Sequence, residues 1–333
     1  MPARFTAFHQ YSGFHETVPP LLVAPYRGKG LVKLINVRSF NIQSDLRFNR
    51  SDLTVKDVTA EADKSVLEYA QEFPATLRDE YTATHIRHGL HGSALLSIEG
   101  KRLSYLADLN YVNGRIQAPL QVYTVPWRQV TISFRFVHYW NVDKEMKAGT
   151  THDPSLAEKL VAFLNRYYLP AANVEFELKS ALPINFSRFL GSPISEAQFM
   201  EFFIPQKDSA AEMTVFFAGE FRTSDNRYGA SHFNAGCAIV SDHPIGEYLP
   251  PDTTWPSKSP TFEQSEAWID QRVRAANLKP RTSSDRELHH TLAHEVGHLL
   301  GHAGHNRQDE HIMTETSLRN FKMDRPFIGM IHR

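Results

Sequence analysis

The chain of 333 residues has one cysteine, Cys237, which excludes an internal disulfide. It lacks an apolar run long enough to span a bilayer, and its first residues lack the apolar core of a secretory signal peptide. Neither sign of charge dominates, because 36 basic side chains face 37 acidic ones, so electrostatics give no reason to expect nucleic acid as a partner. We therefore expect a protein without a membrane span, either cytoplasmic or exported without a cleavable signal peptide.

The length and the hydrophobic content of 41% are sufficient for two domains. The first, residues 1–125, is predicted to be rich in β-structure, with a helix at 58–73 and a hairpin turn at Asn113-Gly114. Its strands are expected at residues 31–40, 95–98, 103–109 and 116–125. The role of this domain, whether docking, delivery or that of a pro-segment, is left open.

Residues 126–333 show the alternation of strands and helices that is typical of a second, mixed domain. A helix is expected from Pro154 to Pro170, because Asp153-Pro154 is a helix start signal and a second proline ends the apolar pattern. Ser195 and Gln198 predict a short capped helix further along. The strands of this domain are expected at residues 129–140, 174–178, 213–221 and 236–241.

The motif that points to a chemistry is His-Glu-x-x-His, at residues 294–298. His294 and His298 are one helical turn apart, so both imidazoles project from one face of a helix and can share one metal ion. Glu295 stands beside them as a candidate general base. An apolar stripe at helical spacing supports the helix, and it consists of Leu288, Leu292, Val296 and Leu299.

The surrounding residues make a chance match implausible. Ser284 and Glu287 form a capping box ahead of the motif. Gly301 follows it and can end the helix in a left-handed turn that reverses the chain. A third imidazole, His305, comes just beyond that turn, and Met313 follows shortly after.

The segment from His294 to Met313 resembles the metzincin clan of zinc endopeptidases, whose pattern is HExxHxxGxxH followed by a methionine turn. The run His-Glu-Val-Gly-His-Leu-Leu-Gly, and the gap between His305 and Met313, are similar to those of matrixin-like members. One feature departs from the family pattern, because position 304 is Gly304 and the third histidine comes one residue later. The connection has to accommodate one extra residue, which a glycine makes easier.

His302 is the rival third ligand, since it lies one helical turn beyond His298. Three histidines along one face of a continuous helix would span about 12 Å, whereas zinc–nitrogen bonds are about 2.0–2.1 Å long. Such a row cannot easily surround one tetrahedral ion, so His305 is preferred over His302. Asp309 and His311 are further candidates nearby.

The resemblance implies an α+β protein, in which a β-rich N-terminal domain precedes a catalytic domain at residues 126–333. That domain would have a twisted, mostly parallel sheet with an antiparallel edge strand, a backing helix and an active-site helix. It implies one catalytic Zn²⁺ held by His294, His298 and His305, with Glu295 taking a proton from the water that attacks a peptide bond. Met313 would lie beneath the metal as a hydrophobic floor.

In this family an extended substrate lies antiparallel to the sheet edge, along the strand just before the active-site helix. The candidate here is the segment of Gly236, Cys237, Ala238 and Ile239, for which an ordinary core strand is an equally good interpretation. The expected partner is therefore a protein or peptide substrate.

Two other functions are compatible with these residues. Peptide deformylases also use HExxH, with a cysteine as the third ligand, and Cys237 would take that place; Gly301 and His305 would then be coincidences. A non-catalytic binding or scaffold protein would keep the metal for structure alone, but such a chain has no need of Glu295.

Three more histidines, His85, His88 and His91, are spaced by three. They are candidates for a second metal site. A polar surface loop is the favoured interpretation, because no carboxylate or cysteine completes the set.

Overall fold

The computed structural model describes residues 3–7, 13–25, 30–37, 40–61, 93–141, 146–150, 152–189, 194–219, 221, 229–241, 288–302, 304–305, 312–313, 323 and 325–332. The chain divides into two compact units. The first comprises Met1–Gln129, Leu164–Glu175 and Met323–Arg333, and the second comprises Val130–Phe163 and Phe176–Lys322. The sequence assigned everything after residue 125 to one domain, whereas two later segments belong to the first unit. None of the helices in the described ranges combines the length and the apolarity needed to cross a membrane.

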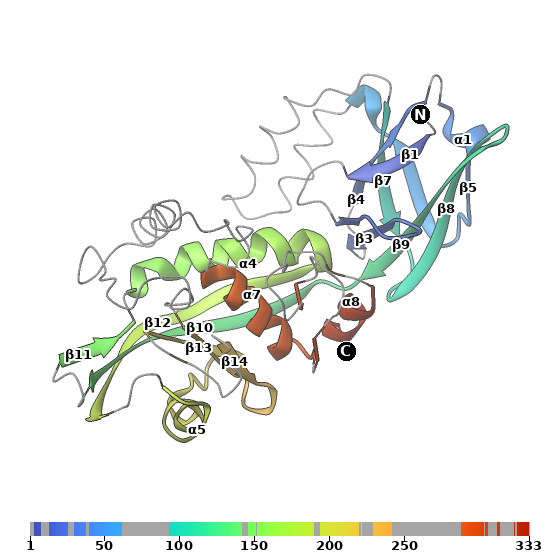
Figure 1. Ribbon diagram of the computed structural model, residues 1–333. Helices are drawn as coiled ribbons and strands as arrows, with labels where there is room; N and C mark the ends of the chain where they lie inside the picture. Colours follow the sequence, from blue (N-terminus) through green and yellow to red (C-terminus); the bar gives the residue numbers. More distant parts are fainter. Residues whose placement is uncertain are drawn as a thin grey trace, which may run out of the picture. The chain divides into compact units, whose positions relative to one another are not determined.

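The first unit contains two β-sheets (Figure 1). An antiparallel sheet has the order β1 (Arg4–Ala7), β4 (Gly30–Ile35), β7 (Ser93–Gly100), β6 (Leu53–Asp57). The other has the order β2 (Phe14–His15), β3 (Leu21–Pro25), β9 (Ile116–Val125), β8 (Tyr105–Asn113), β5 (Leu46–Phe48), and only its β3–β9 pair is parallel. Apolar side chains from both sheets form one buried cluster, so this unit has a single core between two layers.

The hairpin predicted at Asn113-Gly114 joins β8 to β9. Asn113 pairs with Ile116, and Gly114 has a φ of 60°, a left-handed conformation that glycine adopts at little cost. The predicted helix at 58–73 lies largely outside the described residues, and its described part forms the short turn η1 (Thr59–Glu61). The described part of this unit also contains the short helices α1 (Ile42–Asp45) and α8 (Arg325–Ile331), and residues 164–172 of a longer helix that begins in the second unit.

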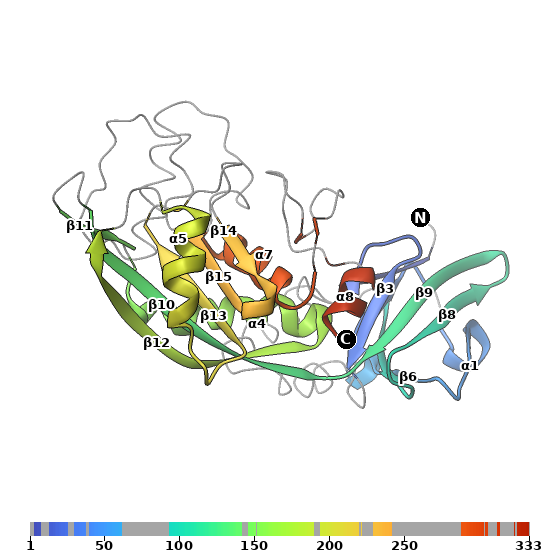
Figure 2. The ribbon, with the colours of Figure 1, turned by 90° about the horizontal axis from the view of Figure 1, so that it is seen from below.

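The second unit is built on a six-stranded sheet (Figure 2). Its order is β11 (Met146–Gly149), β10 (Arg128–Asn141), β13 (Met213–Ala218), β15 (Cys237–Ser241), β14 (Gly229–His232), and β12 (Val174–Phe189) also pairs with β10. The central β10–β13 and β13–β15 pairs are parallel, whereas β11 and β14 are antiparallel to their neighbours. Every residue of β13 and β15 is buried, as expected for parallel strands covered on both faces.

Of the two interpretations of Gly236, Cys237, Ala238 and Ile239, the structure shows the core strand and not a sheet edge. Gly236 is a left-handed turn residue with a φ of 65°, and the other three lie in β15, which has β13 on one side and β14 on the other. In the described part of this sheet, the outer strand on that side is β14. Its four residues are too few for hydrophobic alternation to predict.

The long helix begins where the sequence predicts. The side chain of Asp153 accepts a hydrogen bond from the amide of Ser155, and the turn η2 (Pro154–Leu156) leads into α4 (Ala157–Ala172). The predicted end at Pro170 is wrong, since the helix continues to Ala172. A proline so close to the end removes one hydrogen bond without displacing the rest of the helix.

The predicted capping box is present at the next short helix. Ser195 and Gln198 bond reciprocally to each other's backbone at the start of α5 (Glu196–Gln198). Three further turns position the loops of this unit, namely η3 (Phe199–Phe203), η4 (Ile204–Gln206) and η5 (Phe233–Ala235).

Candidate metal centre

The helix α7 (Leu288–Leu299) carries the HExxH motif and packs against β14 and β15 within the second unit (Figure 2). Its capping box at Ser284 and Glu287 lies outside the described residues. The predicted apolar stripe is buried along its whole length, at Leu288, Leu292, Val296 and Leu299. Burial of this stripe fixes the rotation of the helix about its axis, and therefore the direction in which its histidines project.

The chain reversal predicted at Gly301 is present. The amide of Gly301 donates to the carbonyl of His298 at 3.0 Å, and the amide of His302 donates to the carbonyl of Gly297 at 3.3 Å. These two bonds form a Schellman motif, which requires a residue with positive φ, and Gly301 has a φ of 122°. The reversal ends the helix and turns the chain back past its last turn.

The reversal brings His305 to the two helical histidines. One ring nitrogen from each of His294, His298 and His305 lies within 4.8 Å of the other two. The ring of His305 is stacked on that of His294 at a centroid distance of 5.2 Å, and meets that of His298 edge to face at 5.0 Å. Among the residues that the structure describes, this is the group of side chains that can hold a metal ion.

Backbone carbonyls orient both helical rings. Nδ1 of His294 lies 2.9 Å from the carbonyl oxygen of Ile312, and Nδ1 of His298 lies 2.6 Å from the carbonyl oxygen of His302. A carbonyl oxygen can only accept, so each Nδ1 carries the ring hydrogen, and each Nε2 of the neutral rings presents a lone pair. These contacts are the outer support that metal-binding histidines usually have.

The two Nε2 atoms of His294 and His298 lie 3.2 Å apart. Two lone pairs facing each other at that distance repel unless a cation lies between them. Two nitrogens bound to one tetrahedral zinc ion at about 2.0–2.1 Å would be roughly 3.3 Å apart. The donor set and its spacing therefore fit a zinc ion.

The structure does not bring His302 into this group. Its Nδ1 accepts a hydrogen bond from the amide of Gly304 at 3.3 Å, and its ring centroid is 6.5 Å from that of His298. Asp309 and His311 lie outside the described residues. Met313 is fully buried, and the carbonyl of its neighbour Ile312 contacts His294.

Glu295 is only 6% exposed although it is acidic. A Cβ atom placed on Gly229 would lie 2.5 Å from its Oε1 atom, so the carboxylate lies directly against the outer strand β14. A larger residue there would force this side chain to shift. The sequence did not single out Gly229, and the only signal is a glycine inside a segment too short to predict as a strand.

Cys237 lies apart from the histidine group. Its thiol is buried in β15 and contacts the carbonyl of Ala235 at 3.5 Å. Burial raises the pKa of this thiol to about 11, against a smaller opposite effect of Lys207. A cysteine ligand binds as a thiolate, so nothing here favours a deformylase-type site. His85, His88 and His91 lie outside the described residues.

No protein-family model matches this sequence, and no curated protein matches it. Among solved structures, the chain is similar to archaemetzincin from Methanopyrus kandleri, with 12% identity, coverage of 61% of this chain and 93% of that one, and a TM-score of 0.35. A protein in a chaperone–substrate complex is 8% identical over 71% of this chain and 37% of its own, with a TM-score of 0.31. Likenesses this distant carry no functional argument, so function has to be argued from the site itself.

Proposed function

We propose that the protein is a zinc-dependent peptidase that hydrolyses peptide bonds in a protein or peptide substrate. The observation that supports this most directly is the convergence of nitrogens from His294, His298 and His305 at one point. The buried carboxylate of Glu295 stands next to the first of them in the same helix. The resemblance of this segment to the metzincin clan supports the same activity.

His294, His298 and His305 would hold a zinc ion, which would act as a Lewis acid toward the scissile carbonyl and lower the pKa of a water molecule toward neutrality. The chain's own residues do the rest. The carbonyls of Ile312 and His302 hold the rings of His294 and His298 in the tautomer that offers Nε2. Glu295 takes a proton from the attacking water and returns it to the leaving amine.

We further propose that the substrate binds in extended form along β14, and not along β15 as the sequence suggested. An outer strand offers backbone N–H and C=O groups to a peptide, which a strand with two neighbours does not. Glu295 lies against Gly229 of this strand, so a peptide paired with β14 would pass close to the proposed base. The missing side chain at Gly229 is what allows that approach.

The test is to measure the zinc content of the purified chain and its cleavage of a broad peptide library. About one zinc per chain is expected, with cleavage that stops on adding a chelator and returns on adding zinc. The Glu295→Gln variant should keep the metal and lose at least about 100-fold in rate, because only the base is removed. Zinc binding without cleavage of any peptide would overturn the peptidase and favour a binding protein.

A further inference from the structure

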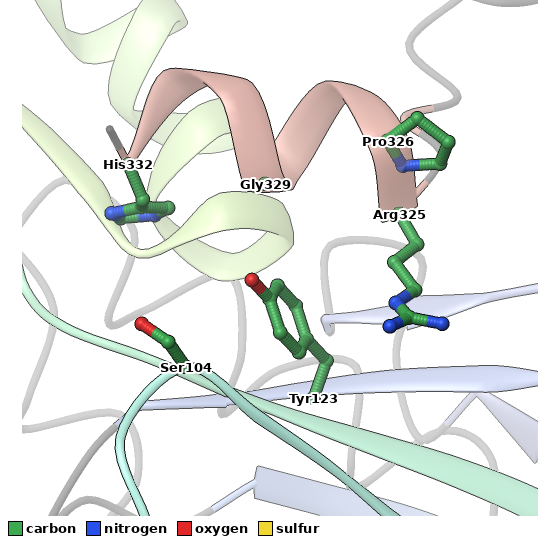
Figure 3. A pocket seen from close by; sticks show the side chains of 6 residues that line it. All are labelled: Ser104, Tyr123, Arg325, Pro326, Gly329 and His332. Carbon is green, nitrogen blue, oxygen red and sulfur yellow. The ribbon is translucent and has the colours of Figure 1, made fainter.

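A cavity of about 550 Å³ lies within the first unit (Figure 3). Its size falls in the range typical of small-ligand sites. Two of its lining residues belong to the β8–β9 sheet region and four to α8 and the residue after it: Ser104, Tyr123, Arg325, Pro326, Gly329 and His332. No residue of the proposed metal centre is among them.

The polar groups at one end of the cavity suit a single negative charge. Among the described residues that line the cavity, Arg325 is the one cationic side chain and none is acidic. Its guanidinium lies 5.8 Å from the centre of the Tyr123 ring, and none of the ion pairs among the described residues involves it. A single guanidinium matches a planar carboxylate, whereas a doubly charged phosphate usually draws more than one cation.

His332 lines the other end of the cavity and offers a hydrogen-bond acceptor there. Nε2 of His332 contacts the carbonyl oxygen of Ala172, so Nε2 carries the ring hydrogen and Nδ1 is an acceptor. Burial, more than any other cause, lowers the pKa of His332, which keeps the ring neutral near pH 7. Nδ1 is buried without a hydrogen-bond partner among the described residues. A buried acceptor left unpaired is costly, and a donor on a ligand would satisfy it.

The spacing of the two ends suggests the ligand. Arg325 and His332 stand at opposite ends of α8, with the Tyr123 hydroxyl between them (Figure 3). Seven residues of helix rise about 10 Å, which matches roughly three residues of extended peptide. We propose that this cavity binds the carboxyl-terminal end of a peptide, with its carboxylate at Arg325 and a backbone N–H at His332.

The probe is N-acetyl-trialanine with a free carboxylate, compared with the same peptide ending in an amide. Binding to the full chain carrying Glu295→Gln is measured by saturation-transfer NMR, so that cleavage cannot affect the result and a failure of the proposed peptidase leaves the test intact. The free acid should bind at least about tenfold more tightly than the amide, because the charged hydrogen bond is lost in the amide. Equal binding of the two peptides, or binding of neither, would overturn the proposal.

Two variants locate the site, and a third serves as the matched control. Arg325→Gln should weaken binding of the free acid about tenfold. Gly329→Val should abolish it by filling the cavity, since a Cβ atom there meets only the Tyr123 hydroxyl, at 3.7 Å, and the helix can keep its fold. Arg115→Gln removes the same charge from the exposed β8–β9 turn and should change nothing.

Circular dichroism confirms that each variant is folded. Unchanged binding in folded Gly329→Val protein would place the peptide elsewhere and overturn the proposal. Competition by inorganic phosphate at a lower concentration than by acetate would overturn the carboxylate assignment.

Discussion

Two polar clusters in the second unit differ in what their polar atoms face. We call the one around Asp208 the closed cluster and the histidine group at α7 the open cluster. Around Asp208, every group finds its partner within the cluster: Oδ2 accepts from Ser180 at 2.6 Å, from Ser133 at 2.8 Å and from Arg135 at 3.0 Å. Oδ1 accepts from the amide of Ala210 at 2.9 Å. At α7, the Nδ1 atoms of His294 and His298 contact backbone carbonyls, and their Nε2 atoms face each other at 3.2 Å.

The difference separates a cluster that serves the fold from one that suits a ligand. The hydroxyl of Ser180, then the amide of Ala210 and the hydroxyl of Ser133, hold the pKa of Asp208 well below its usual value of 3.8. This carboxylate therefore stays charged beside Arg135, which is 7% exposed, and the pair needs nothing further. The Nε2 atoms of His294 and His298 face each other, an arrangement that a bound cation would stabilise.

The largest effect is expected on zinc affinity, when one of the three proposed histidine ligands is removed. His305→Ala should weaken zinc binding at least about 1,000-fold, beyond the 10- to 100-fold typical of losing an outer support. His302→Ala should weaken it less than about tenfold, because its side chain only accepts from the Gly304 amide and its carbonyl, which holds His298, remains. Zinc titration against a chelating dye measures both. Zinc retained in the first variant and lost in the second would reverse the assignment.

Removing the carboxylate of Asp208 should lower the stability of the fold and leave zinc binding unchanged. Asp208→Asn strands the buried charge of Arg135 and should lower the free energy of unfolding by roughly 3 kcal/mol. Chemical denaturation measures this loss, and zinc content serves as the control. Loss of zinc at unchanged stability would show that the two clusters do not have the separate roles assigned to them.

Comparing the wild type with Asp208→Asn at different pH values tests the role of the Asp208 carboxylate. The pKa of Asp208 is lower in the folded chain than in the unfolded one, so its contribution is complete above about pH 4 and declines as the pH falls below its unfolded value of 3.8. The stability gap between the wild type and Asp208→Asn should therefore be constant near neutrality and shrink in acid. Denaturation series between pH 3 and pH 7 measure the gap. A gap that widens on acidification would contradict the sign of this shift.

The smallest effect is expected at Gly229 of β14, which lies against Glu295. Gly229→Ala places a methyl group against the carboxylate of Glu295, so the side chain of Glu295 has to shift. We expect the proposed peptidase to lose about tenfold in kcat, since a displaced base transfers protons poorly. Zinc content and Tm should be almost unchanged. A large fall in Tm with normal kcat in the remaining folded protein would mean that Gly229 serves packing alone.

Much of the local structure was predictable, because hydrophobic period and capping residues act over a few positions. The β8–β9 hairpin at Gly114, the start of α4 at Asp153 and the buried stripe of α7 all follow from such patterns. The end of α4 was mispredicted because a proline near a helix end is tolerated. The strand β14 was missed because four residues carry too little pattern.

The candidate site was predictable to the extent that it depends on one segment. Histidines one turn apart on a helix, a glycine able to reverse the chain and a third histidine beyond it define the donor set from residues 294–305 alone. The support from the Ile312 carbonyl and the contact of Glu295 with Gly229 join segments that local patterns do not connect.

The sequence by itself determined which residues can bind a metal and which face of α7 is buried, since both follow from the geometry of a single helix. Tertiary structure alone decided that β14 and not β15 is the outer strand in the described part of its sheet, that Met323–Arg333 belongs to the first unit, and that Arg325 and His332 line one cavity. The physical reason is that a hydrophobic pattern specifies how much of a segment is buried, whereas its neighbours are chosen by the packing of all segments together.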